Sequence, residues 1–254
     1  MNTEIMKAKK SLGQHFLRSE RALKKIIETG EISPEDTILE IGPGTGTLTR
    51  KLLETGAKVI AIEKDEKLCE SLRKETPSRN LELISGDILE FEPNKLGRYK
   101  VIANIPYYLT GAIIKKFLTA KNHPERMVLL VQKEVAKRII DKKESVLSIS
   151  VKAYGKPKLI ETVKAGSFVP APKVDSAILL IDKVCGYSKE REDLMKVVKA
   201  GFSSKRKKLS SNLSGIFGKD RVQKVFQKIN IDENARAEDV PIEIWQKIAE
   251  RILE

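Results

Sequence analysis

Short apolar runs alternate with amphipathic segments over the first half of the chain. The runs have the length of β-strands and lie at 36–42, 57–65, 80–87, 98–104 and 126–132. The amphipathic segments space their apolar residues as one face of a helix does, at 20–30, 47–56, 66–75, 110–120 and 133–142. Strands that alternate with helices predict an α/β domain in which helices cover both faces of a mostly parallel sheet.

The alternation breaks near the end of this domain. Residues 158–166 and 175–183 read as two strands joined by a Pro-containing loop, so one edge strand of the seven is predicted to be antiparallel. Beyond them the pattern is helical, which predicts a small all-α domain. The expected divisions are a basic N-terminal arm at 1–18, the sheet domain at 19–183 and the helical domain at 184–254.

Basic residues gather near the two ends of the chain. The formal net charge is +13, which fits either a partner with many negative charges or the Lys-rich surface of a thermophilic protein. Between residues 196 and 228, however, ten basic residues face one acid, whereas thermophilic surfaces interleave both signs. This distribution predicts contact with nucleic acid phosphates through Lys9, Lys10, Lys205, Arg206, Lys207 and Lys208.

Several classes of site and compartment are not expected. The two cysteines, Cys69 and Cys185, and the two histidines, His15 and His123, show no spacing typical of a disulfide framework or a metal centre. No apolar run reaches the roughly 18 residues of a membrane helix, and the N-terminus has no apolar core of a secretory signal. A cytoplasmic protein without a metal is therefore predicted.

Polar residues and glycines follow four successive predicted strands. The first strand ends in "EIGPGTGTLT", with Gly42 and Gly44 in a GxGxG turn, and the next three end at Glu63, Asp87 and Asn104. Parallel strands present their carboxyl ends to one ligand site, where a glycine turn lets backbone approach a ligand and an acid can bind ribose. An adenosine-type cofactor is predicted. A nicotinamide dinucleotide is the alternative, which the GxGxG spacing disfavours because dinucleotide sites use GxGxxG.

The stretch "NIPY", at 104–107, ends a strand with an amide, an imide and a phenol. The Asn104 side-chain oxygen and the carbonyl of Ile105 or Pro106 can accept the two N–H groups of an exocyclic amine. Two such acceptors localise the lone pair of an adenine amine, which is otherwise delocalised into the ring, and Tyr107 offers a face on which the base stacks. The corner predicts amine methylation, and Tyr108 is assigned to packing.

Several motifs together resemble one family. They are "SLGQHFL" at 11–17, "EIGPGTGTLT", "NIPYYL", "VQKEVAKRI", "FVPAPKVDSA" and "NARAEDV". In this order they resemble the KsgA family of ribosomal small-subunit RNA adenine dimethyltransferases, over most of the chain. The resemblance implies a Rossmann-like class I methyltransferase domain that uses S-adenosyl-L-methionine. It also implies dimethylation of adjacent adenines near the 3' end of 16S rRNA, within a pre-ribosomal small subunit, by a monomer that takes part in subunit biogenesis.

The resemblance also assigns roles to residues. His15 and Leu17 would close over the cofactor, and Gly42 and Gly44 would contact it. Glu63 would hold the ribose, and Asp87 would bind the adenine amine. Ile88 would line the adenine pocket, and Asn104 would lie beside the methyl group. For the target base, the catalytic set is Asn104, Pro106, Tyr107 and Phe168, with Tyr107 and Phe168 on its two faces. The family often has Asn at the position of His15.

Three alternatives stay open. An Erm-type enzyme shares the catalytic motifs but methylates large-subunit RNA, and "NARAEDV" with the basic C-terminal stretch favours the small-subunit target. A DNA adenine methyltransferase usually carries a larger recognition domain than this chain has room for. A ribosome-assembly factor that binds RNA without turnover would not need Glu63, Asp87, Asn104 and Tyr107 together.

Overall fold

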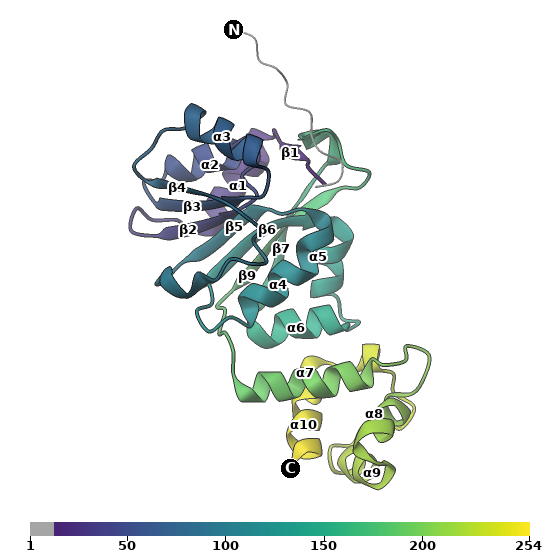
Figure 1. The fold of residues 1–254 in the computed structure, drawn as a ribbon. Coiled ribbons are helices and arrows are strands. Elements are labelled where there is room, and N and C mark those ends of the chain that lie inside the picture. The colour runs from purple at the N-terminus through teal and green to yellow at the C-terminus, as the bar shows by residue number, and fades with distance from the viewer. Residues whose placement is uncertain (1–12) are drawn as a thin grey trace.

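The computed structural model describes residues 13–254. A seven-stranded sheet with helices on both faces forms one part of the molecule, and four C-terminal helices form a smaller part beside it (Figure 1). Lys9 and Lys10 lie outside the described residues. Among those described, no helix combines the length and apolarity needed to span a membrane.

The sheet has the order β4-β3-β2-β5-β6-β9-β7. Its strands are β2 Thr37–Ile41, β3 Lys58–Glu63, β4 Leu81–Ser85, β5 Lys100–Asn104, β6 Arg126–Gln132, β7 Lys156–Val163 and β9 Ser176–Asp182. The first five in space pair in parallel, and β9 runs antiparallel to both of its neighbours. The predicted, mostly parallel sheet is confirmed, and its antiparallel strand lies one position inside the edge that β7 forms.

Within residues 13–254, six helices cover the sheet. They are α1 Glu20–Gly30, α2 Thr47–Leu53, α3 Glu66–Glu75, α4 Thr110–Leu118, α5 Lys133–Ile140 and α6 Val146–Tyr154. Apolar stripes from α1 and α2 pack in the core on one face, and those from α4, α5 and α6 pack in the core on the other. The Ser19 side chain accepts the Ala22 N–H at the start of α1, which satisfies one of the free donors of that helix end. Helix α6 was not predicted.

A two-stranded ribbon lies apart from the main sheet. Strand β1, Phe16–Leu17, pairs antiparallel with β8, Phe168–Val169. Two residues are too few to show a period in the sequence, so the ribbon was not predicted. Short 3-10 turns lie at Pro93–Lys95, Tyr107–Leu109, Ala165–Ser167 and Ala237–Asp239.

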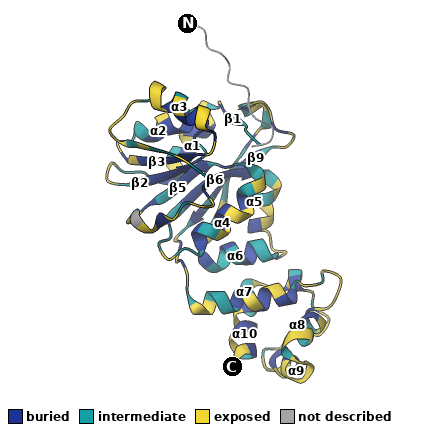
Figure 2. Ribbon diagram, viewed as in Figure 1, coloured by how far each residue is buried: buried dark blue, intermediate teal, exposed yellow. Residues whose placement is uncertain are grey.

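The C-terminal helices have a core of their own. They are α7 Lys189–Gly201, α8 Leu209–Phe217, α9 Lys219–Lys228 and α10 Ile242–Leu253, and they pack around the fully buried Trp245. A Cβ on Gly201 would lie 2.3 Å from the Trp245 ring, so glycine lets α7 approach α10 closely. Ile149 of α6 belongs to this core, and α6 therefore joins the two parts of the molecule. In both parts of the molecule the buried residues lie in the interior, on the strands of the sheet and on one side of the helices (Figure 2).

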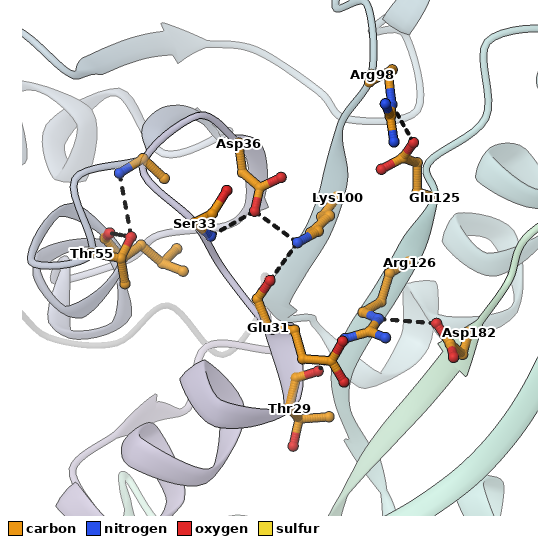
Figure 3. A network of polar contacts seen from close by, with 12 residues as sticks. Thr29, Glu31, Ser33, Asp36, Thr55, Arg98, Lys100, Glu125, Arg126 and Asp182 are labelled. Carbon is orange, nitrogen blue, oxygen red and sulfur yellow. Dashed lines mark hydrogen bonds and ion pairs between the residues drawn. The ribbon is translucent and has the colours of Figure 1, made fainter.

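Ion pairs fix the edge of the sheet where the parallel strands begin. Lys100 Nζ lies 2.7 Å from Asp36 Oδ2. Arg126 Nε lies 3.0 Å from Asp182 Oδ1, and Arg126 Nη1 lies 2.7 Å from Glu31 Oε2 (Figure 3). Ion pairs thus lie at the amino ends of the parallel strands, and a pocket lies at their carboxyl ends.

Candidate functional site

The pocket lies at the carboxyl ends of β2, β3, β4 and β5. Its wall comes from the turn after β2, from the ends of the three other strands and from residues 13–17. Gly42, Gly44, Glu63, Asp87 and Asn104, which are far apart in sequence, all line it. The structure therefore brings together the four strand ends that the sequence picked out.

The glycine turn leaves room for a ligand. Gly42 has a φ of +64°, and no atom lies within 4 Å of where its Cβ would be. Gly44 has a φ of +58°, and a Cβ there would lie 2.8 Å from the ring of Phe16. Both positions need glycine for their left-handed backbone, and Gly44 also needs it because β1 packs on the turn.

Glu63 is held under this turn. Its Oε2 accepts the Gly44 N–H at 3.0 Å and its Oε1 accepts the Asp65 N–H at 2.8 Å, and the residue is 6% exposed. Burial raises the pKa of Glu63, and the backbone donors partly offset this rise. Each oxygen keeps a lone pair, so the carboxylate can still accept hydroxyl groups from the pocket.

Asp87 lies at the end of β4 with a cationic partner. Lys64 Nζ donates to its Oδ2 at 2.7 Å and the Leu89 N–H donates to its Oδ1 at 2.9 Å. The hydrogen bond from Lys64 lowers the pKa of Asp87. The adjacent Ile88 is buried and adds an apolar wall. An ionised acceptor beside an apolar surface suits the edge and face of a purine.

Glu40 is a pocket residue that the sequence analysis missed. It is 1% exposed, and its Oε2 has no hydrogen-bond partner within residues 13–254. Burial raises its pKa to about 8. Its place two residues before Gly42 was the available signal, but nothing local shows that its side chain is buried with one oxygen unpartnered.

Asn104 contacts residues 13–17, the N-terminal segment that lines the pocket. Its Nδ2 donates to the His15 carbonyl at 2.9 Å. This bond fixes which way the amide faces, so that its oxygen points away from the His15 carbonyl and stays available as an acceptor. The Pro106 carbonyl accepts the Leu109 N–H at 3.0 Å, inside the 3-10 turn.

Tyr107 lies next to His15. Their ring centroids are 5.8 Å apart at an interplanar angle of 23°, and His15 Nδ1 lies 2.7 Å from the Pro170 carbonyl oxygen. The Tyr107 hydroxyl lies 2.7 Å from Ser176 Oγ. The phenol ring is therefore held at its hydroxyl end and has a second ring on one side. Leu17, in β1, lines the same pocket and is buried.

The comparison that decides the family covers nearly the whole chain. The family model described as "Ribosomal RNA adenine dimethylase" matches residues 5–254. The chain belongs to this family. The resemblance to the KsgA family is thereby confirmed, and the protein is a methyltransferase by family.

Curated relatives of this dimethylase match it over most of their length. "Ribosomal RNA small subunit methyltransferase A" of Dehalococcoides mccartyi strain CBDB1 is 41% identical, over 98% of this chain and 89% of the relative. The protein of the same name from Nostoc sp. strain PCC 7120 is 40% identical, over 96% of this chain and 98% of the relative.

Solved structures confirm the fold class of the dimethylase. The 23S rRNA methyltransferase ErmE has a TM-score of 0.78 at 28% identity, over 94% of this chain and 100% of its own. A dimethyladenosine transferase from Plasmodium falciparum has a TM-score of 0.80 at 27% identity, over 92% of this chain and 96% of its own. The expected Rossmann-like class I methyltransferase domain is confirmed.

Two aromatic residues lie elsewhere than the sequence indicated. Phe168, expected to stack on the target base, is 2% exposed and packs in a core cluster with Leu17, because the pairing of β8 with β1 turns its ring inward. It is not among the residues that line the pocket. Tyr108, assigned to packing, is 60% exposed and lines the pocket, so that assignment was wrong.

The basic residues of the helical part lie on its surface. Lys205, Arg206, Lys207 and Lys208 are all exposed, in the loop between α7 and α8. None of the four forms an ion pair with another described residue, and Lys208 Nζ donates to Asn234 Oδ1 at 2.6 Å. Their charges are therefore available to an anionic partner. Within residues 13–254, no group of three or more His, Cys, Asp or Glu is placed to hold a metal ion.

Proposed function

We propose that this dimethylase transfers methyl groups from S-adenosyl-L-methionine to N6 of adjacent adenines near the 3' end of small-subunit (16S) rRNA, giving N6,N6-dimethyladenine. The observation that carries the proposal is the Asn104 amide, held by the His15 carbonyl beside Tyr107 at the edge of the glycine-turn pocket. The relatives named small subunit methyltransferase A support the choice of RNA.

The pocket residues fit this cofactor. Glu63 would bind the ribose hydroxyls, Asp87 the adenine amine, and Gly42 and Gly44 give backbone access to the rest. Glu40 has a buried carboxyl oxygen without a partner in the described chain, which suits the cationic amino group of a methionine moiety. When bound, S-adenosyl-L-methionine supplies an electrophilic methyl group on a sulfonium. His15 and Leu17 would cover it, as the family resemblance implies, since both line the pocket.

The acceptor amine would be held by two oxygens. Asn104 offers its side-chain oxygen, since its nitrogen is engaged by His15. The Pro106 carbonyl accepts the Leu109 N–H inside the 3-10 turn and keeps one lone pair, so the second acceptor is the carbonyl of Ile105 or of Pro106. Two preorganised acceptors localise the nitrogen lone pair toward the methyl group. The proton leaves after transfer, when the amine is acidic, so no strong base is required.

The target base must leave its stack to reach these acceptors. Tyr107 would supply the stacking face. The family resemblance implies that Phe168 stacks on the other face of the base. The Phe168 ring lies in the core, so it could reach the base only if β8 moved. His15 is the ring that lies beside Tyr107 here, at 5.8 Å.

The helical part would bind rRNA and thereby select the ribosomal context. Its exposed loop at 205–208 presents four cations to phosphates, which gives affinity without reading sequence. With this loop and the basic N-terminal arm of residues 1–18, we expect a monomer to engage a pre-ribosomal small subunit in the cytoplasm.

The test is mass analysis of nucleosides from small subunits lacking the modification, incubated with the protein and S-adenosyl-L-methionine. N6,N6-dimethyladenosine in the small-subunit RNA is the expected product. Methylation confined to protein-free large-subunit RNA would favour the Erm-type activity instead, and methylation of DNA would favour a DNA enzyme. Subunit binding without any methylated product would favour an assembly factor without turnover.

A further inference from the structure

The hydroxyl of Tyr107 has a buried partner from a distant part of the chain. Its oxygen lies 2.7 Å from Ser176 Oγ, and Ser176 is fully buried at the start of β9. Ser176 pairs with Gln132 on β6 and with Val163 on β7, so its backbone belongs to the interior of the sheet. A hydroxyl in such a place is costly unless it is bonded, and Tyr107 supplies the bond.

The other end of Tyr107 is held as well. Its backbone carbonyl accepts the Thr110 Oγ1 hydrogen bond at 3.0 Å, at the start of α4. With the backbone fixed by Thr110 and the hydroxyl fixed by Ser176, the ring has anchors at both ends of its long axis. Rotation about the Cα–Cβ bond would swing the hydroxyl away from Ser176 and break this hydrogen bond, so the direction of the ring's long axis is fixed.

Asp175, the residue before Ser176, is also held by hydrogen bonds. The carbonyl of the preceding residue, Asp175, accepts the Lys133 N–H at 3.0 Å. The Asp175 carboxylate accepts the Ala165 N–H and the Lys164 Nζ, each at 3.1 Å. Ser176 is thus a rigid anchor, held from the ends of β6, β7 and β9.

We propose that Ser176 is a positioning residue that fixes the direction of the long axis of the Tyr107 ring, and thereby where the ring lies as the platform for the target base. The proposal rests on the proposed function, because it assigns the ring that task. A base stacked on a tilted ring would carry its amine away from the Asn104 oxygen, and small errors in placement cost rate steeply in group transfer. This explains why the corner uses a phenol where a phenyl ring would stack equally well.

The experiment compares Ser176→Ala, Tyr107→Phe and the double variant in methylation of small-subunit RNA. Each single change removes the same hydrogen bond, and each should lower kcat roughly 3- to 10-fold. The KM for RNA and the Kd for S-adenosyl-L-methionine should stay within about 2-fold of wild type, since phosphate contacts and the cofactor residues are intact. The double variant should match the single variants, because the two groups act as one unit.

Ser148→Ala is the matched control. Ser148 is also a fully buried serine, and its Oγ donates to Glu144 Oε2 at 2.7 Å in α6, outside the residues that line the pocket. This variant should lose stability but keep kcat, and its effect should add to that of Tyr107→Phe.

Wild-type kcat in Ser176→Ala, or a double variant whose loss is the product of the single losses, would overturn the proposal. If Ser176→Ala does not fold, Tyr107→Phe alone decides, because a wild-type kcat in that variant also overturns it. A wild-type protein that methylates no RNA would defeat the proposed function, and this result differs from every outcome that concerns Ser176.

Discussion

Asn104 joins the end of β5 to residues 13–17, which line the pocket. Its side-chain nitrogen donates to the His15 carbonyl, and in the proposed mechanism its oxygen accepts the substrate amine. The residue therefore needs both an acceptor and a donor on one small side chain. An amide provides both, whereas a carboxylate would place a negative charge beside the His15 carbonyl.

Asn104→Ala should lower methylation of small-subunit RNA by roughly 10²- to 10³-fold, the scale seen when one preorganised polar contact is removed. Subunit binding should be retained, because the basic loop is untouched. Methyl incorporation and sedimentation with subunits measure the two effects. Asn80→Ala is the control, since Asn80 also donates to a backbone carbonyl, that of Gly56 at 3.0 Å, but is not a pocket residue. Full methylation by Asn104→Ala would contradict the mechanism.

Glu40 predicts a pH dependence of stability. Burial raises its pKa to about 8 from an ordinary value of 4.5, so the folded state binds a proton that the unfolded state releases. This contribution is fully present below about pH 4.5 and is lost as the pH rises through 8. Glu40→Gln removes it, so the variant should gain stability over wild type between pH 5 and pH 9, on the order of a few kcal/mol.

Urea unfolding at the two pH values measures this difference. Glu66→Gln, on the exposed first turn of α3, controls for the loss of one carboxylate. Equal stability differences for Glu40→Gln at pH 5 and pH 9 would show that Glu40 is not buried as a neutral acid.

At the scale of elements, the β1–β8 ribbon supports one wall of the pocket. β1 brings Leu17 into the pocket wall, and its Phe16 ring packs on the turn at Gly44. β8 buries Phe168 in the core cluster that also holds Leu17. The ribbon thus joins residues 16–17 to residues 168–169 and supports the segment whose carbonyl holds Asn104.

Phe168→Leu tests whether this ring acts in the core or on the base. As a core residue it should cost about 1–2 kcal/mol of unfolding free energy and leave kcat near wild type well below the melting temperature. Thermal unfolding and steady-state methylation measure both. Phe117→Leu, a buried phenylalanine of α4, should show the same pattern. If kcat instead falls by roughly tenfold or more, and only with Phe168→Leu, the ring stacks on the target base, since stacking on a base is worth on the order of 1–3 kcal/mol.

At the scale of the whole molecule, one helix serves two cores. The α6 residues Val151 and Tyr154 pack against the sheet, and Ile149 packs among the C-terminal helices. The buried Glu144, just before α6, accepts Ser148 Oγ and Lys152 Nζ, each at 2.7 Å. Because α6 packs in both cores, it joins the helical part to the sheet.

Replacing Lys205, Arg206 and Lys207 with Ala should weaken small-subunit binding and reduce the slope of log affinity against log salt by about 2, because up to three phosphate contacts are lost. The affinity for S-adenosyl-L-methionine should not change. Filter binding across a salt series measures the slope. A Lys189→Ala, Lys196→Ala variant is the control, since both lysines are paired with acids on α7. An unchanged slope in the triple variant would remove this loop from the RNA interface.

Much of the fold and part of the site were determined by the sequence alone. Periods of hydrophobicity are local, so the seven strands and most helices were predicted from short windows. Parallel strands end at one edge, so Gly42, Glu63, Asp87 and Asn104 were predicted to meet there, as they do. The family resemblance, now confirmed, came from motif order along the chain.

Only the tertiary structure decided contacts between residues far apart in sequence. Ser176 and Tyr107 are 69 positions apart, and His15 and Asn104 are 89 apart. No local pattern shows that Phe168 turns into the core, that Tyr108 is exposed or that Glu40 Oε2 has no hydrogen-bond partner in the described chain. These features depend on which side chains meet after folding. The sequence thus determined that Gly42, Glu63, Asp87 and Asn104 reach the pocket, and packing determined how each of them is held there.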